Sequence, residues 1–196
     1  MANLKFLDLF CGCGGLALGF KNAGYKFVMG IDNDKSSLMT LDHNFPETIA
    51  GDYDLFDNNS IAQIKKDVDQ NPPDLIIGGP PCQGFSLTGT RKFDDPRNAL
   101  YLSFIESVKQ MEPEAFLIEN VPGVKNLYDG QIYAEIERRF KKMKYTINAE
   151  ILNSADYGVP QIRKRLFIVG LKQDLGTFDF PDPVLEKDNY ISCKNA

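Results

Sequence analysis

The chain has 196 residues, of which 43% are hydrophobic, 25% charged and 11% aromatic. This composition is typical of one globular domain and excludes a disordered or fibrous chain. The sequence contains no apolar run of about 18 residues, so it predicts no transmembrane helix, and its N-terminus lacks the long apolar stretch of a signal peptide. Four cysteines are too few for a disulfide framework in a chain of this size. We therefore expect a reduced, cytoplasmic protein.

The net charge of -5, from 27 acidic and 22 basic residues, is unusual for a protein that binds nucleic acid. Proteins that hold nucleic acid by neutralising phosphates are normally basic. A nucleic-acid role would therefore depend on local basic patches or on surface from another segment or chain. Two basic clusters are present, Arg91 with Lys92, and Arg138, Arg139, Lys141, Lys142 and Lys144. The second is also typical of a solvated helix face.

Short apolar runs alternate with helical patterns along the chain. In chain order, the sequence predicts a strand at 5–10, a helix at 16–23, a strand at 26–31, a helix at 34–43, a short third strand before Asp52, and a strand at 74–77. A helix through 101–111 follows, with Asp95 as its N-cap and Pro96 as its first residue. A strand at 115–118, a helix through 132–140 and strands near 147–152 and 166–170 complete the pattern. This alternation predicts a doubly wound α/β domain with a mostly parallel sheet covered on both faces.

A glycine-rich loop follows the first strand, at the edge where open α/β sheets bind ligands. Gly12, Gly14 and Gly15 would let the backbone approach a ligand closely, and the next helix offers its N-terminus. Asp32 ends the second strand, where an acid would bind a pair of ribose hydroxyls. The pattern indicates either a nucleotide-like cofactor site or a plain tight turn.

Asp52, beside Tyr53, follows the third short apolar stretch. In this position a carboxylate suits contact with the edge of an adenine. A surface acid in a turn would produce the same pattern.

Cys82 lies in the sequence Gly-Gly-Pro-Pro-Cys-Gln-Gly-Phe-Ser, directly after the fourth strand. A cysteine in such a rigid loop is a candidate nucleophile if nearby positive charge favours its thiolate. The alternative is a small buried cysteine with no chemical role.

Two further strand ends carry charged side chains. Glu119 directly follows an apolar strand, where desolvation could keep a carboxyl protonated and able to donate to a ring nitrogen. Arg163 and Arg165 alternate at the start of the last strand, so both point to one face and could clamp a base edge or phosphate. The alternatives are an acid paired with a local arginine, and a solvated strand edge.

The glycine loop, Pro-Pro-Cys, Glu-Asn-Val and Gln-x-Arg-x-Arg, in this order from about residue 5 to residue 170, resemble the DNA cytosine-5 methyltransferase family. The resemblance implies a Rossmann-like domain that binds S-adenosylmethionine. The residues it places around this cofactor are Phe10, Gly12, Gly14, Gly15, Leu16, Asp32, Asn33, Asp52, Tyr53, Pro80 and Leu100.

The resemblance also implies roles in catalysis. Cys82 corresponds to the nucleophile, Glu119 to the residue that holds cytosine N3, and Arg163 and Arg165 to supports around the base. Gln83 and Ser86 match positions near the flipped nucleotide. We expect no metal site, because the Cys-Gly-Cys of residues 11–13 has no second ligand pair and the chain has one histidine.

The chain departs from the family pattern after Gln-x-Arg-x-Arg. Family members usually continue with a target-recognition region and two further motifs, none of which is visible. We expect residues 1–175 to form the catalytic, cofactor-binding domain, and residues 176–196 to be a tail that leads to a recognition region or a partner chain. Cys11 replaces a frequent serine, and Asn33 replaces a frequent aromatic or apolar residue beside the adenine.

These features favour the catalytic region of a DNA cytosine-5 methyltransferase of the restriction-modification type, acting on double-stranded DNA in a bacterial or phage-infected cell. In this interpretation, a second chain could supply the recognition region. The alternatives are a tRNA cytosine-5 methyltransferase and a non-catalytic remnant that binds cofactor or DNA and regulates an active chain.

Overall fold

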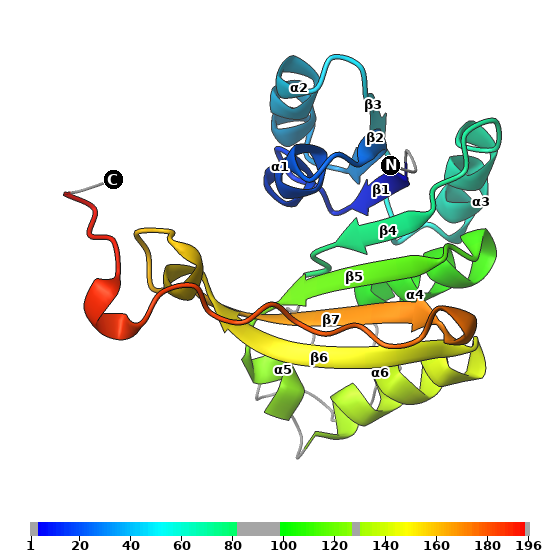
Figure 1. Cartoon of the computed structure of the whole chain (residues 1–196). Coiled ribbons are helices and arrows are strands. Elements are labelled where there is room, and N and C mark those ends of the chain that lie inside the picture. Colours follow the sequence, from blue (N-terminus) through cyan, green and yellow to red (C-terminus); the bar gives the residue numbers. More distant parts are fainter. Residues whose placement is uncertain (1–3, 82–98, 127–129, 195–196) are drawn as a thin grey trace.

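The computed structural model describes residues 4–81, 99–126 and 130–194. Their core is a seven-stranded sheet with the order β3-β2-β1-β4-β5-β7-β6 (Figure 1). The strands are β1 (Lys5–Leu9), β2 (Lys26–Asp32), β3 (Ile49–Asp52), β4 (Leu75–Gly78), β5 (Ala115–Asn120), β6 (Tyr145–Asn153) and β7 (Lys164–Lys172). The first five pair in parallel. β7 runs antiparallel to both β5 and β6.

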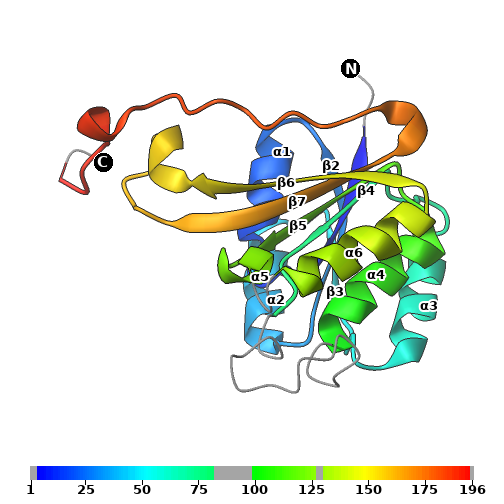
Figure 2. The same cartoon turned by 90° about the horizontal axis from the view of Figure 1, so that it is seen from below.

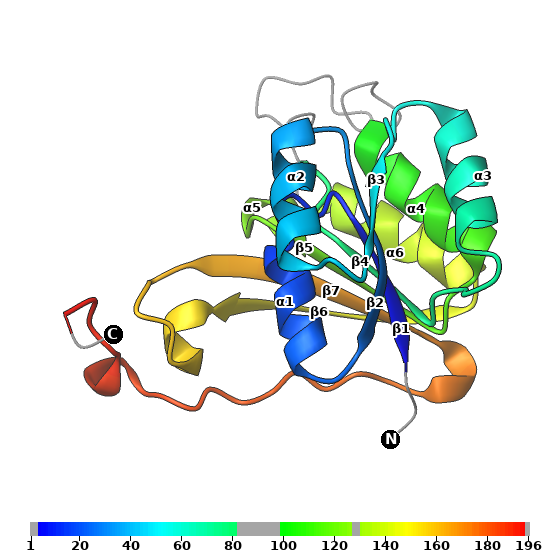
Figure 3. The same cartoon turned by 90° about the horizontal axis from the view of Figure 1, so that it is seen from above.

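Helices cover the two faces of the sheet unequally. They are α1 (Gly15–Asn22), α2 (Lys35–Asn44), α3 (Asn58–Asp67), α4 (Ala99–Met111), α5 (Gly123–Asn126) and α6 (Gln131–Lys142). Helices α1 and α2 lie on one side of the sheet, and α3, α4 and α6 lie on the other (Figures 2 and 3). Each side has its own buried cluster of apolar side chains. The described part of the chain is therefore a three-layer α/β fold.

Local sequence accounts for these elements. All four residues of β4 are buried, as expected for a central parallel strand covered on both faces. In α6 the buried side chains are Ile132, Ile136 and Phe140, at a spacing of four, and charged residues occupy its outer face. Helix α2 starts where the Asp34 carboxylate accepts a hydrogen bond from the Ser37 amide at 2.6 Å.

The α/β fold with a mostly parallel sheet that the sequence predicts is confirmed: four strand pairs are parallel, and the two pairs that involve β7 are antiparallel. Strand β7 extends two residues beyond the predicted 166–170 at each end, and β6 extends two residues before and one residue after the predicted 147–152. The pattern assigned no bounds to α3 and missed α5. Asp95 and Pro96, the predicted start of α4, lie outside the described residues.

The reversed direction of β7 decides where its residues lie. Because β7 is antiparallel to β5, its first residues pair with the last residues of β5: Asn120 is opposite Leu166, and Glu119 is opposite Phe167. The arginines at the start of β7 are thereby brought to the carboxyl ends of the parallel strands. A parallel strand would have placed them at the opposite edge of the sheet.

Beyond β7 the chain runs back along the outer strands as an extended segment (Figure 1). The amides of Val184 and Leu185 donate to the Asp156 carbonyl at 3.0 and 2.9 Å. The Tyr157 hydroxyl donates to the Pro181 carbonyl at 2.8 Å. Among the helices of the described ranges, none combines the length and apolar character needed to cross a membrane.

Gly170 on β7 tests the packing of the outer strands. A Cβ atom at this position would lie 2.1 Å from Cε1 of Phe116, which stacks on Phe140 with ring centroids 4.0 Å apart. We expect Gly170→Ala to lower the free energy of unfolding by about 1–3 kcal/mol, because the ring has to move. The matched control is Gly19→Ala inside α1, where a Cβ meets open space and should raise stability by about 0.5–1 kcal/mol. Urea unfolding followed by circular dichroism measures both; equal effects would contradict this packing.

Candidate active site

Two adjoining cavities open at the carboxyl ends of the parallel strands. The larger has a volume of about 650 Å³ and the smaller about 230 Å³. Phe10 and Gly79 line both. This edge is where doubly wound sheets bind ligands, and the larger volume is in the range of small-molecule sites.

The glycine loop after β1 forms one wall of the larger cavity. Phe10 and Gly12 both have positive φ, 60° and 52°, which turns the chain sharply at the end of the strand. The Gly12 amide donates to Asp32 Oδ2 at 2.8 Å, and the Cys11 amide donates to the Ile31 carbonyl at 3.0 Å. The loop is thereby tied to the end of β2.

The Asp32 carboxylate accepts hydrogen bonds from backbone amides with both of its oxygens. Its second oxygen, Oδ1, accepts from the amides of Asn33 and Asp34 at 2.9 and 3.0 Å. Asp32 and Asn33 also line the smaller cavity. The predicted contact with ribose hydroxyls would therefore be an additional use of a carboxylate whose orientation the backbone already fixes.

Gly14 has a packing role. It is the N-cap of α1 with φ of 88°, and a Cβ there would lie 2.5 Å from Cε2 of Phe45 and 2.8 Å from Cδ1 of Leu41. It does not line either cavity, whereas Gly15 and Leu16 line the larger one. The glycine at 14 thus lets α1 pack against α2 and presents the following residues to the cavity.

The smaller cavity lies between β2, β3 and α4. Tyr53, Leu55, Leu100 and Pro81 line it together with the residues from β2. The Tyr53 hydroxyl donates to Asp67 of α3, which also accepts from Gln63 Nε2 at 2.8 Å. Asp52, predicted to contact an adenine edge, is exposed and does not line this cavity; it ends β3 opposite Asp32.

Glu119 of β5 and the two arginines all line the larger cavity. Arg165 lies within β7, and Arg163 directly precedes this strand. Arg165 Nε lies 2.8 Å from Glu119 Oε1, and Arg163 Nη2 lies 3.8 Å from the same oxygen. The Arg165 side chain is 24% exposed and the Arg163 side chain 47% exposed. The acid is therefore paired with arginine, and Arg165 is the closer and better-shielded partner.

Asn120 connects this acid to the loop that leads to Cys82. The buried side chain donates from Nδ2 to the Pro80 carbonyl at 2.9 Å and accepts from the Val121 amide at 2.8 Å. It thereby fixes the backbone of the Pro-Pro turn to the end of β5. Pro80 is buried and lines neither cavity, whereas its neighbour Pro81 lines the smaller one.

Three predicted residues lie outside the described residues: Cys82, Gln83 and Ser86. The basic pair Arg91 and Lys92 also lies outside them.

The second basic cluster is largely paired within α6. Arg138 and Arg139 contact Glu135 at 2.5 and 2.9 Å, and Lys141 contacts Glu137 at 2.9 Å. These helical pairs at i,i+3 and i,i+4 support the interpretation of a solvated helix face.

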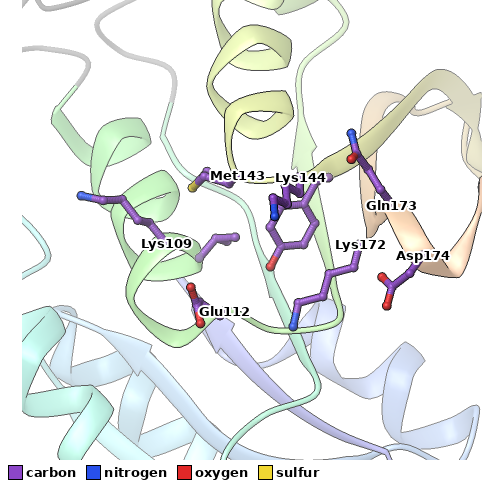
Figure 4. Close-up of a pocket in the computed structure, with 9 residues that line it drawn as sticks. Lys109, Glu112, Met143, Lys144, Lys172, Gln173 and Asp174 are labelled. Atoms are coloured by element: carbon purple, nitrogen blue, oxygen red, sulfur yellow. The ribbon is translucent and has the colours of Figure 1, made fainter.

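A third cavity, of about 450 Å³, lies at the opposite edge of the sheet (Figure 4). Lys109, Lys144 and Lys172 surround it together with Glu112 and Asp174. Mixed charges at its rim and the absence of a glycine loop among its lining residues give it no recognisable ligand chemistry. The candidate active site is therefore the pair of cavities at the carboxyl edge.

Sequence reasoning missed three polar residues of this region. Asp8 lies inside an apolar strand run, which was a visible signal of a special environment. Asn120 and Asp67 act through contacts between distant segments, with Pro80 and Tyr53 respectively. No local pattern indicates such contacts.

Comparison with known proteins identifies the family. The family model described as C-5 cytosine-specific DNA methylase matches residues 4–193. The chain belongs to this family. It is 42% identical over 191 residues to the Type II methyltransferase M.AquIA of Picosynechococcus sp., covering 91% of this chain and 76% of that protein. It is 38% identical over 192 residues to M1.HphI of Haemophilus parahaemolyticus, covering 96% of this chain and 51% of that protein.

Two solved structures also superpose on most of the chain. A crystal structure described as a DNA modification methyltransferase encoded within a prophage of E. coli superposes with a TM-score of 0.80 at 36% identity, over 98% of this chain and 53% of that chain. DNMT2 of Spodoptera frugiperda superposes with a TM-score of 0.70 at 27% identity, over 93% of this chain and 54% of that chain. The chain spans about half the length of most of these methyltransferases.

Asp67 gives a spectroscopic test of the smaller cavity. Its hydrogen bond with the Tyr53 hydroxyl raises the pKa of Tyr53 to about 12. The contribution of this hydrogen bond to the free energy of unfolding is therefore complete below about pH 10, the usual tyrosine pKa. It is lost as the pH rises through about 12. We expect Asp67→Asn to return the pKa of Tyr53 toward 10. Ultraviolet titration of tyrosinate, with Tyr53→Phe to identify the signal, measures it.

The control is Asp69→Asn, which changes a neighbouring exposed carboxyl and should leave the titration unchanged. A pKa of Tyr53 that stays at its wild-type value in Asp67→Asn would contradict the hydrogen bond.

Proposed function

We propose that this chain is the catalytic and cofactor-binding portion of a DNA cytosine-5 methyltransferase that takes its methyl group from S-adenosylmethionine. The observation that carries the proposal is the convergence in one cavity of the glycine loop and the Glu119–Arg165 pair, with Asn120 holding the turn that leads to Cys82. Family membership supports the reaction type.

The residues present fit the cofactor. The larger cavity has at its floor Asp8, whose two buried carboxylate oxygens have no hydrogen-bond partner among the described residues. An unpartnered buried carboxyl suits a ligand that carries positive charge. The smaller cavity offers an aromatic and an aliphatic wall, Tyr53 and Leu100, which suit a flat base.

In this proposal the methionine part of the cofactor lies against the glycine loop, and the nucleoside part against β2 and β3. The residues assigned to it are Phe10, Gly12, Gly15, Leu16, Asp32, Asn33, Tyr53 and Leu100, with Gly14, Asp52 and Pro80 acting through their neighbours. When bound, the cofactor supplies an electrophilic methyl group.

The protein residues have to make cytosine C5 nucleophilic. The Cys82 thiolate adds to C6, which turns the ring into an enamine and gives C5 the electron density to accept the methyl group. Glu119 holds the N3 edge of the ring, and Arg165 stabilises the charge that develops on the base. Loss of the C5 proton then expels Cys82 and restores the ring.

The target base has to leave the helix for this chemistry. Neither C5 nor C6 is accessible to a thiolate and a methyl donor together within stacked DNA, so the cytosine is flipped into the cavity. Gln83 and Ser86, next to the nucleophile in sequence, are assigned to the flipped nucleotide and its phosphates.

We assign sequence recognition to polypeptide outside residues 1–196. We divide the chain into a catalytic region at 1–175 and a segment at 176–196 that leads toward the recognition region, which a second chain could supply. Such a contribution also explains how a protein with a net charge of -5 acts on DNA.

Methyl transfer tests the proposal. Tritiated S-adenosylmethionine is supplied with duplex DNA or with tRNA, to the chain alone and to the chain with extract of the cells that express it. We expect DNA methylation that is lost in Cys82→Ser and retained in the matched control Cys193→Ser, which changes an exposed cysteine. Transfer to tRNA alone would contradict the DNA substrate, and cofactor binding without transfer to either would favour a regulatory role.

The two arginines give a graded test in the active assembly. Removal of a preorganised charge-stabilising donor typically lowers kcat by about 10²–10³-fold. We expect a loss of this order in Arg165→Ala and a smaller one in Arg163→Ala, because Arg163 is farther from Glu119 and more exposed. Single-turnover methylation rates with saturating cofactor measure both. A larger loss in Arg163→Ala would contradict the assigned order.

A further inference from the structure

Asp8 is an ionisable residue at a buried strand position of the kind that apolar residues usually occupy. It is the fourth of the five residues of β1, and its relative exposure is 1%. Neither carboxylate oxygen has a hydrogen-bond partner in the part of the chain that the structure describes. An isolated ionised carboxylate in such a place is very costly, so the group has to be neutral or to face a positive charge.

The groups of the described residues that act on Asp8 do not supply that charge. From β2, the Asp32 carboxylate adds negative charge. In the loop after β1, Cys11 is a buried thiol, and its own pKa is raised by burial and then by Asp8 and Asp32. From α1, the Ala17 amide favours the ionised form, but it does not complete a hydrogen bond of normal geometry.

Among the described lining residues, the remaining charged groups of the cavity are engaged elsewhere. Both arginines that line it contact Glu119, and neither is among the groups that act on Asp8. The other ionisable side chains that line it are Cys13 and Tyr157. Burial and then repulsion from Asp32 raise the pKa of Asp8 well above its usual value.

We propose that Asp8 carries a proton in the cofactor-free protein and releases it to solvent when the positive charge of the cofactor reaches the floor of the larger cavity. The O–H bond of the Asp8 carboxyl breaks, the proton passes to water or buffer, and the cofactor's cation replaces it as the neutralising charge. Cofactor binding is thereby coupled to pH. This inference rests on the proposed function, because S-adenosylmethionine supplies the cation through its sulfonium and ammonium groups.

Calorimetric titration of the full chain tests the coupling. Binding of S-adenosylmethionine is measured in buffers of different ionisation enthalpy between about pH 5.5 and 7, which gives the number of protons released. We expect release approaching one proton per cofactor, and affinity that rises by up to about tenfold per pH unit. In Asp8→Asn, whose amide resembles the protonated acid, we expect no release and an affinity that does not depend on pH.

Two further ligands identify the charge that matters. S-adenosylhomocysteine keeps the ammonium group and lacks the sulfonium, and adenosine lacks both. Release with S-adenosylhomocysteine assigns the effect to the ammonium, and release with S-adenosylmethionine alone assigns it to the sulfonium; both results support the proposal. Equal release with adenosine would overturn it, because the proton would then come from another group.

Stability of the free protein gives a second measurement. A carboxyl whose pKa is raised in the folded state destabilises the fold as pH rises from its unfolded value of about 4 toward the raised one. We therefore expect the melting temperature of Asp8→Asn to exceed that of the wild type by an amount that grows over this range. Saturating S-adenosylmethionine should reduce the difference.

These experiments distinguish a failure of the Asp8 proposal from a failure of the proposed function. Cofactor binding without proton release, or release that persists in Asp8→Asn, overturns the role of Asp8 and leaves the proposed function standing. Failure of S-adenosylmethionine to bind at all overturns the proposed function, and this inference with it.

Discussion

The antiparallel pairing of β7 with β5 is the constraint on which the rest of the site depends. It places the start of β7 beside the end of β5, so that Arg165 Nε lies 2.8 Å from the Glu119 carboxylate. The next residue of β5, Asn120, then holds the Pro80 carbonyl and with it the turn that precedes Cys82. The direction of β7 thus brings the arginine to the acid, and the parallel pairing of β4 with β5 brings the segment before the thiol to the same edge, where the glycine loop follows β1.

Charge is distributed unevenly across this edge. Glu119 is matched by arginine on the side where the base is proposed to bind. On the cofactor side, Asp32 satisfies its oxygens with three backbone amides, while Asp8 has no partner in the described structure. Among the described residues, the carboxylate on the side of the base is therefore neutralised by arginine, whereas Asp8 and Asp32 on the cofactor side have no cationic partner. A cationic cofactor would complete the balance, which links the proposed cofactor to the proposed protonation of Asp8.

Local sequence was sufficient to predict the α/β class and the alternation of elements, and it placed the glycine loop, Glu119, Arg163 and Arg165 at strand ends, where residues of that loop and all three side chains line the larger cavity. The periodicity of apolar residues and the ends of buried strands carry that information within a few residues of each site. The direction of β7 was not predicted, because apolar runs of 166–170 and 147–152 look alike whether the strands pair in parallel or antiparallel. The packing role of Gly14 against Phe45 and the contact of Asn120 with Pro80 depend on segments distant in sequence. No local pattern contains them.

The central claim is that Cys82 attacks a cytosine held beside Glu119. Duplex DNA in which 5-fluorocytosine replaces cytosine tests it most directly, because fluorine at C5 cannot leave as a proton does and the covalent intermediate persists. The chain, cofactor and extract of the expressing cells are incubated with this DNA, and the adduct is mapped by peptide mass spectrometry. The account requires a cofactor-dependent adduct on Cys82. An adduct on Cys13 or Cys193, or none when methyl transfer to ordinary DNA occurs, would contradict it.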